Sequence, residues 1–137
     1  MLQIFLHIVS YDIWFYFSHL LLHKYLWWIH RIHHEKREPI WIDTYHGHWF
    51  ESVFQSLGFF LPLIFLNVST SSGIALVYIN IRAMLHHDRR GSWIVGDYHL
   101  IHHKHPTINY GQPYLDFLFG TNSQFKNGNL MKMELTI

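Results

Sequence analysis

The chain of 137 residues contains no cysteine. Disulfides, zinc fingers with thiolate ligands and iron–sulfur clusters are therefore excluded, because each of them needs cysteine sulfur. A metal ion bound by this chain must be held by imidazole and carboxylate groups, which suit iron, zinc, copper and manganese.

Charged side chains are also scarce, at 14% of the residues against about 25% in a typical soluble domain. Because 50% of the residues are hydrophobic and 18% are aromatic, the chain has too little charge to coat a soluble particle. A net charge of +1 without a polybasic tail gives no support to nucleic-acid binding. The apolar N-terminus lacks the basic region and cleavage site of a signal peptide. The composition therefore favours a membrane protein.

The apolar segments predict helices. Residues 2–28 predict one helix, because their polar residues recur at steps of three and four and so share a face. Two apolar runs follow at 53–68 and 74–85, and "STSSG" separates them. At 1.5 Å per residue they are about 24 and 18 Å long, shorter than the ~30 Å hydrocarbon core. We predict an all-α integral membrane protein with a transmembrane or re-entrant hairpin; buried helices of a soluble protein are the alternative.

Histidine is the most unusual component, with 14 residues. H-x-x-H-H occurs at 30–34 and at 99–103, H-x-x-x-H occurs at 19–23, and two adjacent histidines stand at 86–87. Side chains at i, i+3 and i+4 share a helical face, so each set can point at one spot. Burying so many imidazoles without coordination would leave many polar groups in need of partners. Since a zinc site takes about four ligands, this number implies two metal ions.

The order and spacing of these motifs resemble the fatty acid hydroxylase / sterol desaturase superfamily. The resemblance is carried by "DIWFYFSHLLLH" at 12–23, by "HRIHH" and "HLIHH", and by the tail "NYGQPYLDFLFGTNSQF" at 109–125. It covers nearly the whole chain, so we expect a single domain, 1–137. Leu115 stands where the family has tryptophan, and the given sequence starts almost at the first motif, which in family members usually follows one or two transmembrane helices. A fragment, a compact homologue and an inactive remnant all remain open.

The resemblance implies a set of metal ligands that hold two iron ions, with zinc as a substitute in overexpressed protein. The candidates are His19, His23, His30, His33, His34, His86, His87, His99, His102 and His103, with either His86 or His87 as the ligand of its pair. "HWFE" at 48–51 resembles the H-P-x-E of sterol-oxidising members. Candidates for hydrogen bonds to ligand imidazoles are Asp12, Tyr16, His48, Tyr110 and Asp116, with ordinary packing or turn roles as the alternative. His7 is expected to be structural.

The implied function is O2-dependent di-iron hydroxylation or desaturation of a lipid such as a sterol, sphingoid base or fatty acyl chain. Electrons would come from an external donor such as cytochrome b5, because no flavin or haem motif is visible. A non-catalytic, histidine-rich membrane metal-binding protein is the alternative. A metallohydrolase is disfavoured, because H-E-x-x-H does not occur. Lysines and arginines flank the histidine motifs, which predicts a histidine-rich cap on the cytosolic side of the membrane, the endoplasmic reticulum if the source is eukaryotic.

Overall fold

The computed structural model describes residues 1–122, and these form helices without strands. The all-α prediction is therefore confirmed for this part of the chain. The last three residues of the tail motif, 123–125, lie outside the described residues. The α-helices are α1 (Leu2–Tyr25), α2 (Trp27–His30), α3 (Trp49–Phe60), α4 (Thr70–His86), α5 (Ser92–Val95), α6 (Tyr98–Lys104) and α7 (Pro113–Leu118), and the 3-10 helices are η1 (His33–Glu35), η2 (Trp41–Tyr45) and η3 (Leu61–Ile64).

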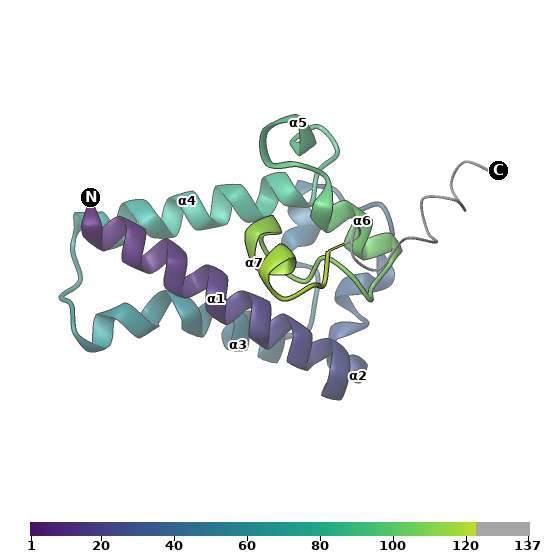
Figure 1. Ribbon diagram of the computed structural model, residues 1–137, viewed down its shortest axis with the longest axis horizontal. Coiled ribbons are helices and arrows are strands. Elements are labelled where there is room, and N and C mark those ends of the chain that lie inside the picture. The colour runs from purple at the N-terminus through teal and green to yellow at the C-terminus, as the bar shows by residue number, and fades with distance from the viewer. Residues whose placement is uncertain (123–137) are drawn as a thin grey trace.

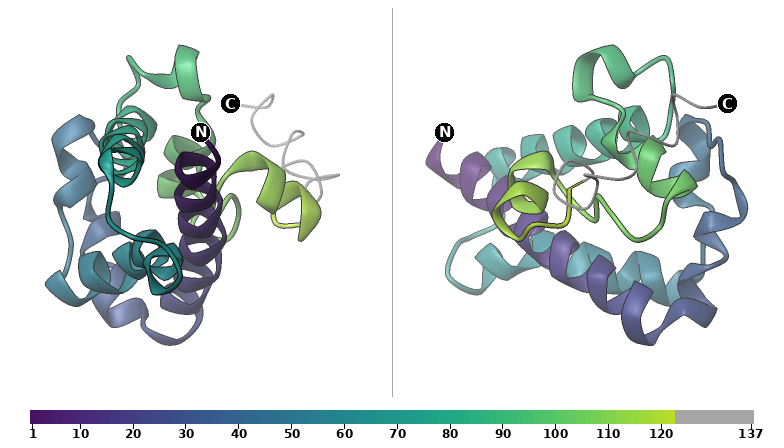
Figure 2. Two further views of the ribbon diagram at one scale, coloured as in Figure 1. Left: turned by 90° about the vertical axis from the view of Figure 1, so that its left-hand side faces the viewer. Right: turned by 45° about the vertical axis from the view of Figure 1, so that its right-hand side comes forward.

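Three long helices form the body of the molecule, and α1 packs against both of the others (Figure 1). The chain runs away from the histidine-rich end along α3, turns through η3 and residues 65–69, and returns along α4. Figure 2 shows this array from its N-terminal end in the left view. The short helices α2 and α6 lie near the opposite end of α1 and α4, where the histidines lie, and α5 lies against the end of α4. Helix α7 lies beside the middle of α1.

The contact between α1 and α3 is close and hydrogen-bonded. A Cβ added at Gly58 would lie 2.5 Å from Trp14 Cβ, so the lack of a side chain allows the two helices to approach. His7 Nδ1 donates to Phe59 O (2.9 Å), Ser10 Oγ to Gly58 O (2.8 Å) and Trp14 Nε1 to Phe54 O (2.7 Å). These three donors recur along one face of α1. His7 therefore has the structural role expected of it.

Several helix boundaries differ from the sequence-based expectation. The single helix predicted for 2–28 is interrupted at Leu26, whose φ of −125° and ψ of 33° are not helical. The polar stretch at 69–73 forms the start of α4, because Ser69 Oγ accepts a hydrogen bond from Ser72 N and caps the helix. Between His86 and residue 122, Gly and Pro residues interrupt the chain, and this region forms three short helices, α5, α6 and α7.

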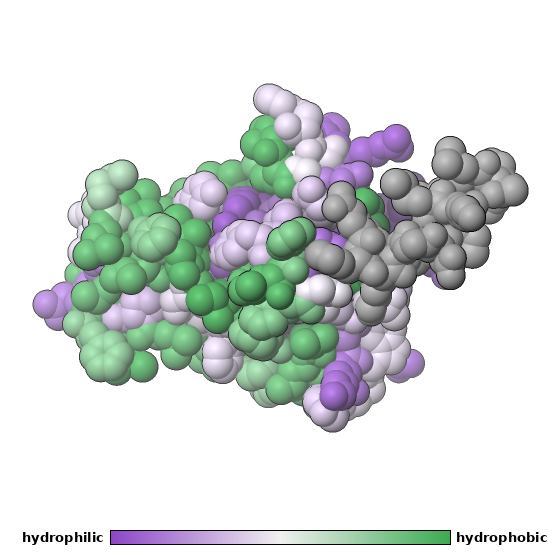
Figure 3. Space-filling view, in the orientation of Figure 1, coloured by the Kyte–Doolittle hydropathy of each residue, from purple (hydrophilic) through white to green (hydrophobic). Residues whose placement is uncertain are grey.

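The outer surface of the three-helix body is apolar. Within the described residues, α1 is the one helix long and apolar enough to cross a membrane, and Trp49–Ile64 is a shorter apolar helix. On the face shown in Figure 3, hydrophobic surface covers most of the half of the molecule that contains the N-terminal part of α1. Exposed apolar side chains there include Leu2, Phe5, Leu6, Ile13, Leu57, Phe60, Ile64, Ile74, Val77 and Ile81.

Candidate metal centre

Nine histidines converge in two clusters, and the ligand atoms within each cluster lie within 4.8 Å of one another. Cluster A takes residues from α1, α2, η1 and α6, whereas cluster B takes residues from η1, α6 and the end of α4. Cluster A consists of His19, His23, His30, His34 and His102, and cluster B consists of His33, His87, His99 and His103.

Each H-x-x-H-H motif contributes to both clusters. His30 and His34 belong to cluster A, whereas His33 between them belongs to cluster B. The motif on α6 shows the opposite division: its middle histidine, His102, belongs to cluster A, whereas His99 and His103 belong to cluster B. This differs from the expectation that each motif points at one spot. On a helix, i+4 lies about 40° to one side of i and i+3 about 60° to the other, so one motif can serve two sites.

Backbone carbonyl groups fix the tautomers of five of these rings. A carbonyl oxygen can only accept a hydrogen bond, so the Nδ1 atom that faces it carries the proton and Nε2 carries a lone pair. The five pairs are His19 with Tyr110 O (2.6 Å), His102 with Ile108 O (2.6 Å), His33 with His46 O (2.9 Å), His87 with Ala83 O (2.9 Å) and His103 with Lys36 O (3.0 Å).

The Nε2 atoms of these rings face one another. In cluster B, His33 Nε2 and His87 Nε2 are 3.0 Å apart, although each ring already uses its proton on Nδ1. Burial lowers the pKa of His33 and lowers that of His87 to about 3, so neither ring takes up a second proton at neutral pH. Two lone pairs therefore point at each other, an arrangement that a cation between them turns from repulsive to favourable.

The distances fit a metal ion. Two imidazole nitrogens that are each about 2.1 Å from one metal, at angles of 90–109°, lie about 3.0–3.4 Å apart. The Nε2–Nε2 distances in cluster A are 2.9 Å for His19–His30, 3.0 Å for His23–His102 and 3.1 Å for His34–His102. In cluster B, His103 Nε2 is buried without a hydrogen-bond partner. Each cluster could thus hold a metal ion that accepts imidazole ligands, as iron and zinc do.

The sequence-based assignments missed one residue that supports cluster A. Glu51 is buried in the first turn of α3, and its Oε1 accepts a hydrogen bond from His30 Nδ1 at 2.8 Å. His48, the candidate chosen from the same "HWFE" stretch, instead caps α3, where its Nδ1 accepts from Phe50 N at 3.1 Å. The available signal was an acidic residue just before an apolar helical run, since such a residue is rarely buried without a partner.

Two of the other supporting candidates act on the loop beside cluster A. Tyr110 offers its backbone carbonyl to His19, not its hydroxyl. Asp116 holds that carbonyl in place, because its carboxylate accepts from Tyr110 N (2.7 Å) and Gly111 N (2.9 Å). Tyr16 and Asp12 make no hydrogen bond to either cluster: the Tyr16 hydroxyl contacts Thr121 Oγ1, and Asp12 pairs with Arg82 and Tyr114.

The structure separates the two adjacent histidines at the end of α4. His87 belongs to cluster B, whereas His86 lies outside both clusters, with Gln112 Nε2 donating to its Nε2 at 3.3 Å. His105 also lies outside the clusters; it ends α6 with a φ of −130°, because the following Pro106 disfavours helical geometry at the residue before it.

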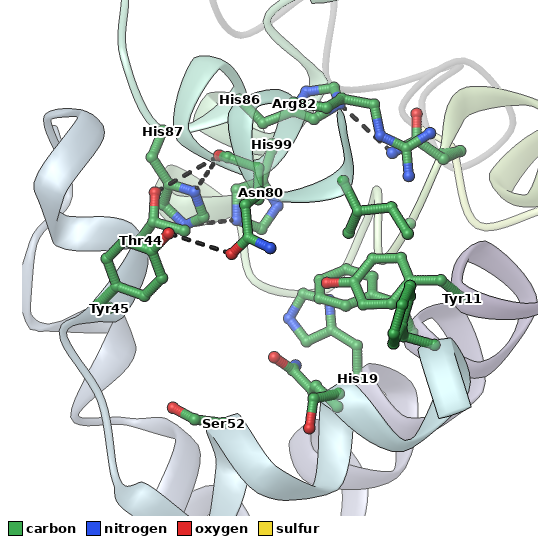
Figure 4. A pocket seen from close by; sticks show the side chains of 18 of the residues that line it. Tyr11, His19, Thr44, Tyr45, Ser52, Asn80, Arg82, His86, His87 and His99 are labelled. Carbon is green, nitrogen blue, oxygen red and sulfur yellow. Dashed lines mark hydrogen bonds between the residues drawn. The ribbon is translucent and has the colours of Figure 1, made fainter. Parts of the chain in front are cut away.

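A cavity of about 340 Å³ leads to both clusters (Figure 4). Its inner end is lined by His19 of cluster A and by His33, His87 and His99 of cluster B. Its walls come from α1, α3, α4 and η2, and they include Phe15, Phe59 and Ile79. The clusters are therefore accessible from a space that aliphatic groups can occupy.

Comparison with known proteins gives a family match over most of the chain. The family model for "Fatty acid hydroxylase" matches residues 4–121. Methylsterol monooxygenase 1 of Rattus norvegicus is 37% identical over 57 residues, which cover 40% of this chain and 20% of that protein. The match thus spans about a fifth of the length of this relative. No solved structure matches the chain.

Proposed function

The chain belongs to the fatty acid hydroxylase family, and from this premise we propose that it catalyses the O2-dependent hydroxylation or desaturation of a lipid. The observation that carries the proposal is the pair of histidine clusters at the inner end of an apolar-walled cavity. The name of the rat relative, a methylsterol monooxygenase, makes a sterol the first candidate substrate. A sphingoid base and a fatty acyl chain are the other candidates.

We assign one iron ion to each cluster, with the nine clustered histidines as ligands and His87 as the ligand from its pair. Bound iron supplies the O2 activation that is needed to break an aliphatic C–H bond, which acid–base groups cannot do. The protein's own residues orient the imidazoles: the carbonyls of Tyr110, Ile108 and His46 accept their Nδ1 protons. Such partners typically raise metal affinity or activity by 10- to 100-fold.

The cavity walls position the lipid and exclude water from the site. Phe15, Phe59 and Ile79 offer apolar contacts to the aliphatic part of the substrate, while four of the clustered histidines border the inner end. A dry cavity strengthens electrostatic interactions at the site and limits side reactions of reactive species. Electrons must be supplied from outside the chain, and a protein such as cytochrome b5 is the proposed donor.

We further propose that the three-helix body lies in the membrane and that the histidine clusters lie on its cytosolic side, at the endoplasmic reticulum if the source is eukaryotic. Seven lysines and arginines near the histidine motifs are exposed: Lys24, Arg31, Lys36, Arg37, Arg89, Arg90 and Lys104. Ser71 lies in the first turn of α4, at the opposite end of that helix from His86. A cysteine at 37 should react with a cytosolic reagent, whereas a cysteine at 71 should not; equal labelling of both would contradict the hairpin.

Metal content and O2 consumption test the catalytic proposal. The purified protein should contain about two transition-metal ions per chain, and the iron form should consume O2 in the presence of a reductant and a lipid. Expression in a host deficient in sterol or sphingolipid hydroxylation, followed by lipid analysis, should identify the product. Bound metal without O2 consumption would favour a non-catalytic metal-binding protein. A folded protein with no metal would indicate an inactive remnant, and one ion per chain would contradict the dinuclear site.

A further inference from the structure

The cavity has a polar band in its wall that the proposed chemistry does not use. Ser52, Gln55 and Ser56 of α3 all line the cavity, and their i, i+3 and i+4 spacing places them on one face of that helix. Asn80 of α4 and Tyr45 of η2 also line the cavity. Figure 4 shows Ser52 on the opposite side of the cavity from Tyr45 and Asn80.

These five polar residues lie between the histidines at one end of the cavity and apolar residues at its other end. Gln55 is four residues beyond Glu51, which contacts His30, and is therefore about 6 Å further along the axis of α3. Phe59 lies about 6 Å further still in the same direction. On α4, Asn80 lies about 10 Å from His87 along the helix axis, and Leu76 lies one turn further from His87 than Asn80 does. A lipid that fills the cavity would therefore contact polar side chains of the wall close to the histidine clusters.

Not all of these polar groups are free to bind a ligand. Asn80 Oδ1 accepts from the Tyr45 hydroxyl (3.2 Å), and its Nδ2 donates to Leu76 O (2.8 Å). Ser56 Oγ donates to Val53 O (2.8 Å). By contrast, the amide of Gln55 and the hydroxyl of Ser52 make no side-chain hydrogen bond with any residue in the range 1–122.

The charge of the cavity lining limits which chemical group of a lipid can bind beside Gln55. Among the residues that line the cavity, Arg82 is the one with a permanent charge. Its guanidinium donates to both carboxylate oxygens of Asp12, which neutralises it. A phosphate or carboxylate would therefore find no unpaired cation in this wall, and leaving a charge there without one is costly. An uncharged hydroxyl or carbonyl group can instead donate to or accept from a primary amide.

On the basis of the proposed function, we propose that Gln55, with Ser52 beside it, is a specificity-determining residue that hydrogen-bonds an uncharged hydroxyl or carbonyl group of the lipid. The carbon to be oxidised lies on the histidine side of this group, within a few bonds of it. The remaining aliphatic part contacts Phe59 and Leu76 on the other side.

Equilibrium binding to the purified metal-loaded protein in detergent tests this assignment without turnover. The probes are a radiolabelled sterol and a ceramide, each paired with a derivative whose hydroxyl groups are methylated, and palmitate as the charged comparator. The wild type should prefer at least one free hydroxyl lipid to its methylated derivative by about 2- to 12-fold, as loss of one hydrogen bond implies. Palmitate should bind more weakly than that lipid.

Gln55→Leu should abolish the preference while it retains the metal content and the binding of the methylated lipid. Ser56→Ala is the matched control, because Ser56 lines the same cavity but its hydroxyl is already paired, and it should keep the preference. The assignment would be overturned if Gln55→Leu kept the preference for the free hydroxyl lipid or if the wild type showed no such preference. It would also be overturned if palmitate bound more tightly than the hydroxyl lipids. These results are distinguishable from failure of the proposed function, which would appear as absent metal or absent O2 consumption in the wild type.

Discussion

Clusters A and B present the same side chain in two different settings. In cluster A, a buried carboxylate, that of Glu51, accepts the proton of His30, and the loop held by Asp116 supplies the carbonyl for His19. In cluster B, the Nδ1 partners of His33 and His103 are backbone carbonyls. Cluster A therefore depends on particular side chains that a mutation can remove, whereas the orientation of cluster B depends on the path of the backbone.

The two clusters also differ in what they face. Three of the four histidines of cluster B line the cavity proposed for the lipid, but only His19 of cluster A does so. His23 of cluster A borders a separate, more open groove together with Lys24 and Trp27. The Trp27 ring lies 5.2 Å from that of His23, and 41% of the residue is exposed. Cluster B thus contributes more histidines to the lining of the proposed lipid cavity, and cluster A lies closer to the surface.

The largest expected effect is the loss of a histidine from the centre of cluster A. His102 is fully buried, and its Nε2 lies 3.0 Å from that of His23 and 3.1 Å from that of His34. His102→Ala should abolish lipid oxidation and weaken metal binding by more than the 10- to 100-fold typical of residues that only support ligands. Metal analysis and product assay at matched expression measure this.

His105→Ala is the matched control for that variant, because His105 lies on the same segment but outside both clusters. It should retain most of the metal and the activity. If it lost as much metal as His102→Ala does, the assignment of ligands by helical face would be wrong.

The next effect tests whether the clusters bind metal independently. His87→Ala should leave three histidines in cluster B, lower the metal content from about two ions to about one, and abolish oxidation. His86→Ala should retain both ions, since His86 contacts Gln112 and neither cluster. Metal analysis of the two variants after dialysis against a weak chelator provides the measurement. If His86→Ala lost an ion and His87→Ala kept both, His86 would be the ligand of the pair and the assignment of His87 would be wrong.

The histidine motifs could be found from the sequence because their information is local. Spacing of three and four residues is visible without a structure, and the absence of cysteine left imidazole as the main ligand. Glu35 directly follows the first H-x-x-H-H motif but faces away from the ligands, since it contacts His46. The division of each motif between two clusters could not be found in this way, because it depends on where α6 and η1 lie relative to α1.

The supporting interactions were harder to predict for a similar physical reason. Five of the Nδ1 partners are main-chain carbonyls, and every residue has one, so no residue type identifies them. Tyr110 was selected from its motif for its side chain, whereas the atom that contacts His19 belongs to its backbone. Asp12 was also selected from its motif, but it pairs with Arg82 across 70 residues of sequence.

A smaller effect is expected where a side chain supports cluster A without entering it. Burial raises the pKa of Glu51 to about 8. Glu51→Gln keeps the shape of the side chain but removes the carboxyl group, whose ionised form is the stronger acceptor for the His30 Nδ1–H donor. The affinity of cluster A for its metal ion should fall by about 10- to 100-fold, as for other residues that orient a ligand. The metal in cluster B of the same protein is the internal control. A chelator titration should therefore show two distinct steps, and a simultaneous loss of both ions would contradict a separate role for Glu51.

The smallest effect is expected at the corresponding position beside cluster B. Glu35 Oε2 lies 3.1 Å from His46 Nε2, and the carbonyl of His46 accepts the proton of His33. Both side chains of this pair are exposed, at 38% and 61%, and exposed pairs contribute about 0–1 kcal/mol. Glu35→Ala should therefore weaken metal binding in cluster B by at most about fivefold. The same chelator titration measures it beside Glu51→Gln. If the two variants lost metal equally, cluster B would depend on side chains as much as cluster A does, and the distinction between a carboxylate-supported and a backbone-supported site would fail.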